Sequence, residues 1–355
     1  MAISANAMAM QAMDDSALSA TTGQDGINIG IGISKVTIDK LFVHDNDGLS
    51  ANTPGTTPPT PLQVGQAGYG GTLTPGAIVI QGVTDPTRAR TITLTSVTGT
   101  GTDTISTADQ AIYVGANYSD SGVYLLRSGN LADLQIDADG SADGAFLNIA
   151  AQVSGLEIHI GEIGVAASNA APAVGATNIQ RGASTTNYNA ILSGLSIKTG
   201  QMNANVQLGA APQGAMIKLD TTMIGGLEIE GLGILDNSTA GATLAAGVTT
   251  NGPGEIYIES IKVADAGERN LTIKQDVQVF GSSAANKGFI KITSDSGAHD
   301  IYVKGVHLGS YNRNLAAGEK QGTSIGDIEI QGMQTYYSPS LGTYLPGSVI
   351  TISGR

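Results

Sequence analysis

A short pattern of apolar residues recurs along most of this chain and limits what it can fold into. In a clean copy, from Leu227 to Ile234, two alternating apolar residues are followed by a two-residue step and two more. Each copy predicts two short strands of period two, joined by a corner that keeps the apolar side chains on one side. Further full or partial copies begin at Leu134, Leu156, Leu195, Ile256, Leu271, Ile301 and Ile328. A chain that repeats such a unit usually stacks it.

The repeated unit predicts the fold class. Several copies follow one more alternating apolar pair, as Ile217 and Leu219 precede Leu227. Strand, turn, cornered strand pair and loop make one rung, so we expect an all-β protein built as a β-solenoid of stacked short strands. A short helix over residues 10–26 and an alternating strand at 27–33 precede it. A β-sandwich is the structural alternative, which explains the alternation but not the repeated corner.

Composition divides the chain into five parts. The first part contains Ala5-Asn6-Ala7, which fits the small-x-small cleavage rule of signal peptides. The predicted parts are a signal-peptide remnant at 1–9, an N-terminal helix and exchangeable strand at 10–43, a Pro/Gly hinge at 44–61, a β-solenoid body at 62–335 and a C-terminal cap at 336–355.

Charge and residue usage exclude several classes of protein. The net charge is -13, with only 17 Lys and Arg, which argues against binding to nucleic acid or to anionic lipid. The absence of cysteine excludes disulfides and thiolate chemistry. No apolar run approaches the ~18 residues of a membrane span. With 4 Phe and no Trp, aliphatic side chains must fill the interior, as suits thin and regularly layered folds.

The region from Met13 to Ile33 resembles a known family. Its sequence runs Met13-Asp-Asp-Ser-Ala-Leu-Ser-Ala-Thr-Thr-Gly-Gln-Asp-Gly26 and continues into four alternating isoleucines. It is similar to the N-terminal signature of the pilus-system (Fil-type) secreted surface proteins of Gram-negative bacteria. The resemblance implies secretion through export or assembly machinery and a place in a fibre or surface layer. The rest of the chain matches that family only in being Gly-rich, Ile-rich and β-repetitive.

The alternating strand is the predicted polymerisation strand. Its isoleucines lie along one edge and its glycines leave the other edge bare, at Ile27, Ile29, Ile31, Ile33, Gly30 and Gly32. Such a strand can add to an exposed sheet edge of another subunit while its side chains fill a row of pockets. The same alternation also fits the first strand of the chain's own body. We therefore expect a non-enzymatic subunit of a homopolymeric surface fibre.

Two other functions remain open. A monomeric adhesin or glycan-binding protein would use the Ala-, Thr- and Asn-rich loops at 166–187 and 236–254. A polysaccharide-cleaving solenoid enzyme would need acids and a base in one groove, for which Arg127 with Asp137 and Asp139 is the only nucleus.

Acidic residues form the best candidate metal site. Asp137, Asp139 and Asp143 lie closely spaced on a Gly-containing loop, and such carboxylates suit Ca²⁺. The spacing departs from the twelve-residue calcium loop, and an ordinary solvated turn explains the same residues. The histidines at 159 and 307 alternate with apolar residues, so we expect them on the solvated side of their strands.

Overall fold

The computed structural model describes residues 26–53, 55–86, 88–89, 91–95, 102–140, 142, 144–239, 253–282, 288–309 and 324–353. The signal remnant and nearly all of the predicted N-terminal helix lie outside these ranges. The described chain is almost entirely β-structure, so the predicted all-β class is confirmed. Helical turns occur at α2 (Ser119–Gly122) and at the 3₁₀ turn η1 (Asn237–Thr239).

Sheet A has eight strands, and every pairing in it is antiparallel. In spatial order they are β1 (Ile27–Ile31), β8 (Ala132–Asp139), β9 (Phe146–Val153), β14 (Met202–Gly209), β15 (Ile217–Met223), β18 (Leu271–Phe280), β19 (Phe289–Ser294) and β24 (Ser348–Ser353).

Sheet B has twelve strands, again all antiparallel. They are β2 (Lys35–Ile38), β3 (Lys40–Asp45), β4 (Gly76–Gln81), β7 (Ile112–Ala116), β10 (Leu156–Ile160), β11 (Glu162–Ala167), β12 (Asn189–Leu192), β13 (Leu195–Lys198), β16 (Leu227–Asp236), β17 (Gly254–Asp265), β20 (His299–Gly309) and β21 (Gly326–Met333).

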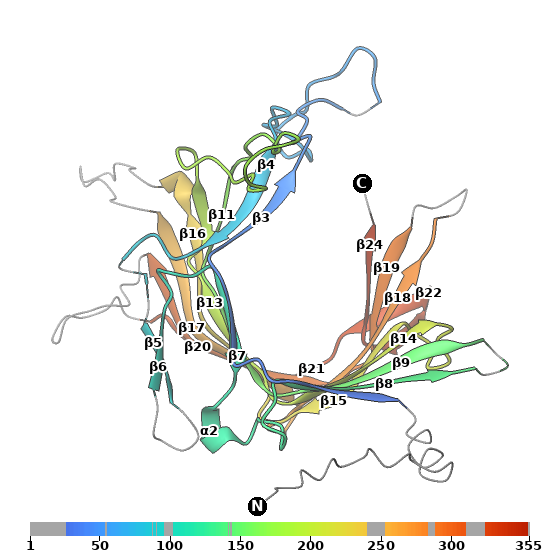
Figure 1. Cartoon of the computed structure of the whole chain (residues 1–355). Helices are drawn as coiled ribbons and strands as arrows, with labels where there is room; N and C mark the ends of the chain where they lie inside the picture. The colour runs from blue at the N-terminus through green and yellow to red at the C-terminus, as the bar shows by residue number, and fades with distance from the viewer. Residues whose placement is uncertain are drawn as a thin grey trace, which may run out of the picture.

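The chain runs between the two sheets as a meander. It passes from β1 in sheet A to β2 and β3 in sheet B, returns through β4 and β7 to β8, and repeats this path until β21 and β24. Some passages take only a few residues, as between β9 and β10, whereas residues 117–131 with α2 separate β7 from β8 and residues 334–347 separate β21 from β24. Figure 1 shows the result, a curved wall with sheet B on the left and the last strands of sheet A on the right.

Two small hairpins stand apart from the large sheets. One joins β5 (Thr91–Thr95) to β6 (Thr102–Ser106), and the other joins β22 (Tyr336–Ser340) to β23 (Thr343–Pro346). The predicted C-terminal cap therefore contains a hairpin and the last strand of sheet A. The predicted hinge at 44–61 begins with the last two residues of β3 and continues into residues 46–75, which connect the paired strands β3 and β4.

The repeated motif forms its predicted strands, but neighbouring copies do not stack as coils. In β16 the step falls at Gly231, which has a φ of 70°. The strand continues through it in the same sheet, and its ladder to β17 keeps one register from Leu227 to Asp236. In sheet B, the copies in β10, β13, β16, β17, β20 and β21 pair side by side in alternating directions, whereas stacked coils would repeat one direction. A solenoid is not shown, and the two antiparallel sheets fit the sandwich-like alternative.

Candidate functional site

One face of sheet A carries an unbroken row of β-branched apolar side chains. The ladders place these residues directly opposite one another across all eight strands, in the order Ile27, Ile136, Ile149, Val206, Ile217, Val277, Ile292 and Ile350. Cross-strand pairs of this kind are the unit of sheet stabilisation. The row therefore fixes the register of the whole sheet and reaches both of its edges.

Sheet B carries two comparable rows. The first runs Val36, Val114, Ile158, Ile197, Ile229, Ile261, Val303 and Ile328. The second runs Leu41, Ile80, Ile163, Leu192, Ile234, Ile256 and Leu308. The full copies that begin at Leu156, Leu227, Ile256 and Ile301 each contribute one residue to each of these two rows.

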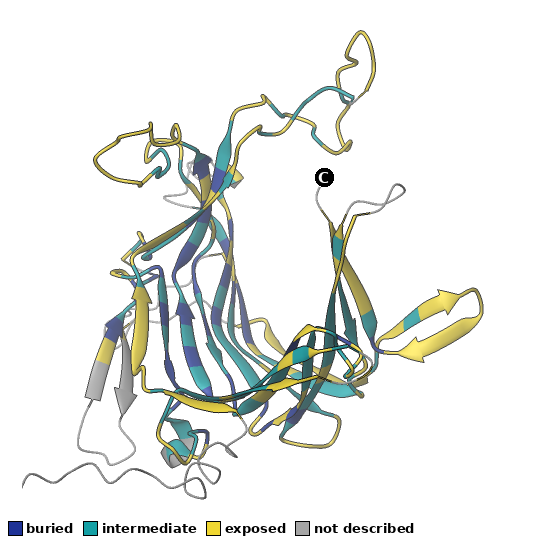
Figure 2. Cartoon of the chain, turned by 45° about the vertical axis from the view of Figure 1, so that its right-hand side comes forward, coloured by how far each residue is buried: buried dark blue, intermediate teal, exposed yellow. Residues whose placement is uncertain are grey.

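No residue of the three apolar rows is buried: eight are exposed and the others are half-buried. Val43 and Ile78 are directly opposed on the same face of sheet B and are 56% and 47% exposed, and Leu308 is 60% exposed. The alternate residues Ala77 and Val79 point to the other face and are buried. Figure 2 shows exposed positions distributed along both sheets. Contiguous exposed apolar surface of this extent marks an interaction site.

The polar face of sheet B is covered instead. Ile105 of β6 packs on Tyr113 of β7, and both are buried. Tyr113 pairs with His159, so it belongs to the face opposite the apolar rows. The β5–β6 hairpin lies on the outer side of the curved wall in both views (Figures 1 and 2). The apolar rows of sheet B therefore line the concave side.

Two buried carboxylates of sheet B contact the segment between β4 and β5. The Thr84 hydroxyl donates to Glu162 at 3.0 Å, and the Arg88 guanidinium lies 3.5 Å from Glu255. Glu162 is 1% exposed and Glu255 is 3% exposed. Burial, with the neighbouring Glu162 charge, raises the pKa of the Tyr188 hydroxyl. These contacts join residues from between β4 and β5 to strands β11 and β17.

A serine, a histidine and a glutamate line up on the same face. Ser196 Oγ lies 2.6 Å from His159 Nδ1, and His159 Nε2 lies 3.4 Å from Glu157 Oε1. Ser196 is 1% exposed, so no substrate reaches its hydroxyl. The arrangement is a structural contact. His159 and His307 lie on the polar side as expected but are buried, so the expectation of solvated rings is wrong.

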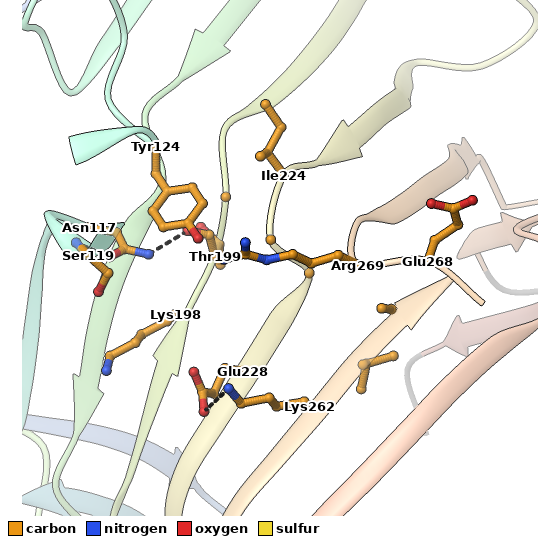
Figure 3. A pocket seen from close by; sticks show the side chains of 15 residues that line it. Asn117, Ser119, Tyr124, Lys198, Thr199, Ile224, Glu228, Lys262, Glu268 and Arg269 are labelled. Atoms are coloured by element: carbon orange, nitrogen blue, oxygen red, sulfur yellow. Dashed lines mark hydrogen bonds and ion pairs between the residues drawn. The ribbon is translucent and has the colours of Figure 1, made fainter. Parts of the chain in front are cut away.

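The convex side also holds a polar pocket of about 530 Å³ at the border between the sheets (Figure 3). Tyr124 overhangs it, and two lysines from sheet B face it. Lys262 pairs with Glu228 at 3.3 Å, and Lys198 pairs with Glu230 at 3.1 Å. Glu268 and Arg269 also line the pocket, so its wall carries both acidic and basic side chains.

Both sheets end in exposed strands. In the described part of the chain, β1, β2, β3, β21 and β24 each pair with a large-sheet strand on one side alone. All eight residues of β21 are exposed, as are five of the six in β24. An unpaired edge offers a row of free N–H and C=O groups to another strand.

Hydrogen bonds to carboxylates hold the edge strand β21 against β20. The Tyr302 hydroxyl donates to Asp327 at 2.6 Å, and the Gly305 amide donates to the same carboxylate at 2.8 Å. These bonds lower the pKa of Asp327. The amides of Gly267 and Gly332 likewise lower the pKa of Asp300.

The predicted polymerisation strand is β1, and it lies in the chain's own sheet A. Ile27, Ile29 and Ile31 share one face, as the alternation predicted, and pair with β8. Gly30 permits a close approach, because a Cβ there would lie 2.5 Å from the Asn130 amide nitrogen. Ile33 and Gly32 follow the strand, and Ile33 is half exposed.

The predicted calcium ligands are only partly described. Asp137 and Asp139 lie on one face of β8, and Asp143 lies outside the described residues. Among described residues, no group of three or more metal-ligating side chains comes together. The calcium site stays a prediction. Within the same part of the chain, no hydrogen bond or ion pair joins the exposed Arg127 to either carboxylate.

The fold and its surfaces define the class: an all-β protein of two wide antiparallel sheets with exposed apolar rows and open edges. Residues 1–82, which end just beyond β4, match the model of a family of unknown function, DUF6160. No curated protein and no solved structure matches the chain. In the described part, no helix has the length and apolar character needed to cross a membrane.

Sequence reasoning missed the contacts on the convex side. The segment that supplies Thr84 and Arg88 has no periodic pattern, and its partners Glu162 and Glu255 lie about 80 and 170 residues away. The sequence did contain one indication. Several copies of the apolar motif include a carboxylate residue, which implies a polar face that another segment could cover.

Proposed function

We propose that this protein is a non-enzymatic structural subunit of an extracellular fibre on the surface of a Gram-negative bacterium. Subunits are exported by secretion or assembly machinery and join one another by β-strand addition and end-to-end stacking. The observation that carries the proposal is the pair of open edges. Each large sheet begins in an exposed strand near the N-terminus and ends in an exposed strand near the C-terminus.

Edges of this kind favour open assembly. The N-terminal edge and the C-terminal edge are different surfaces, so a contact between them is heterologous. A heterologous contact that does not close into a ring produces a filament. The motif predicted regular stacking of coils within one chain. In this proposal, whole subunits stack regularly instead. Strand β1 contributes either in place or by exchange into the preceding copy.

A second candidate function is adhesion. The loop between β11 and β12 carries Val174 and Ile179, which are 107% and 93% exposed. Apolar side chains held fully in solvent on a loop that a rigid sheet presents are suited to contact another surface. A monomeric adhesin or glycan-binding protein would use this loop.

Negative-stain electron microscopy of the purified protein, intact and lacking residues 1–34, separates the two. Fibres from intact protein alone support a subunit that uses its N-terminal strand. Fibres from both proteins keep the fibre function and move the contact to the remaining edge strands. Monomers from both remove the fibre function and favour the adhesin. Val174→Ser with Ile179→Ser then serves as the adhesion-loop variant in a surface-binding assay.

A further inference from the structure

The geometry points to one particular contact between copies, and this inference rests on the proposed function. Strands β24 and β21 of one copy pair with strands β1 and β2 of the next, so that a single docking event extends both sheets. The partner is a second copy of this chain. The N-terminal edges of the two sheets follow one another directly, with three residues between β1 and β2, so they can dock together.

Strand direction suits this contact. Sheet A has eight strands, and every ladder between neighbours is antiparallel. Eight is an even number, so β24 runs opposite to β1. A second copy placed at β24 in the same orientation as the first therefore presents an antiparallel β1. The antiparallel order continues across the junction without reversing either subunit, as a head-to-tail filament requires.

The apolar rows set the register. The row that begins at Ile27 ends at Ile350, and the row that begins at Val36 ends at Ile328. Both rows keep their place relative to the border between the sheets. A copy that continues both rows at once places its Ile27 opposite Ile350 and its Val36 opposite Ile328. A slip by one residue would turn every one of these side chains to the other face.

Charges on the polar face agree with this register. The row beside Val36 on the polar face runs Lys35, Gly115, Glu157, Lys198, Glu228, Lys262, Tyr302 and Glu329. Acid and base alternate along it, and Lys262 and Glu228 form an ion pair at 3.3 Å. The row ends in an acid and begins in a base. In the proposed register, Lys35 of the incoming copy faces Glu329.

A charge exchange tests the contact. The assay measures the critical concentration for fibre formation, by light scattering and electron microscopy, for the full chain and for Lys35→Glu, Glu329→Lys and the double variant. Either single change puts like charges opposite one another, and we expect the critical concentration to rise about tenfold at low salt. The double variant restores an opposite pair and should return to within about twofold of the parent.

A matched control is Lys291→Glu. Lys291 lies on the polar face of β19, an interior strand. Its replacement by glutamate changes the net charge by the same amount as Lys35→Glu. It should leave the critical concentration within about twofold. Monomer thermal unfolding of each variant, below the critical concentration, separates a lost contact from a lost fold.

The outcomes are distinct. Weakened single variants with a restored double variant support the contact. Fibres that form equally well from all variants overturn this contact and leave the fibre function standing. Single variants that weaken without rescue overturn the register. A parent protein that stays monomeric at all concentrations removes the fibre function itself, and the contact with it.

Discussion

Replacing Glu162 by alanine tests the least expected feature of the fold, the burial of the polar face of sheet B. Both carboxylate oxygens of Glu162 accept from the Thr84 hydroxyl, at 3.0 and 3.2 Å, and the residue is 1% exposed. A hydrogen bond to a charged group contributes about 1.5–3 kcal/mol. Thr84 is exposed, so water can satisfy its hydroxyl once the carboxylate is gone. Release of a buried charge offsets part of the loss. We expect Glu162→Ala to lower the free energy of unfolding by about 1–2 kcal/mol.

Urea denaturation followed by circular dichroism measures this loss as a lower midpoint at unchanged slope. The matched control is Glu329→Ala, which removes the same side chain from the exposed strand β21 and should cost less than about 0.5 kcal/mol. Equal, small losses in the two variants would refute the reasoning, because they would show that water reaches Glu162.

Three further predictions concern the corner, the edge strand and the apolar row. Gly161→Ala should lower the thermal midpoint sharply, because a Cβ there collides with the Gln81 and Gln110 carbonyl oxygens. The pKa values of Asp300 and Asp327 are lowered from 3.8 by their hydrogen bonds. Their stabilisation is present above pH 3.8 and is lost as the pH falls through the folded-state values, so amide exchange in β21 should accelerate in that window. Ile350, 53% exposed, gains about 1 kcal/mol on being covered, so Ile350→Thr should raise the critical concentration about fivefold, whereas Thr351→Ser on the opposite face should not.

The strands could be predicted from the sequence, but their partners could not. The alternation from Leu227 to Ile234 predicts two short strands joined by a corner, whereas the structure has one strand, β16, with the step at Gly231. The alternation carries no information on direction, because coils of a solenoid and arms of a meander present the same apolar face. Hairpin connections between successive strands determine which strands pair. The length and composition of the loops do not reveal those connections in advance, because several loops have similar composition.

The buried side of sheet B was also beyond the pattern. Hydrophobic periodicity predicts an apolar face but does not say what covers it. Here Thr84, Arg88 and Ile105, which lie outside the two large sheets, cover part of the polar face, while Ile78 and Val43 stay exposed on the other face. The alternation correctly placed Ile27, Ile29 and Ile31 on one face, but it did not reveal that their strand pairs with β8.

Disulfide trapping tests the central claim, contact between opposite sheet edges, most directly. The chain contains no cysteine, so Asn28→Cys with Val349→Cys creates the only thiols. In the proposed register these positions face each other, and directly opposed strand residues lie about 4.5–5.5 Å apart, within disulfide reach. We predict that oxidation of assembled protein gives a ladder of covalent oligomers on a denaturing gel, with far less from the shifted pair Asn28→Cys and Thr351→Cys. Oxidised protein that runs only as a monomer would contradict the account.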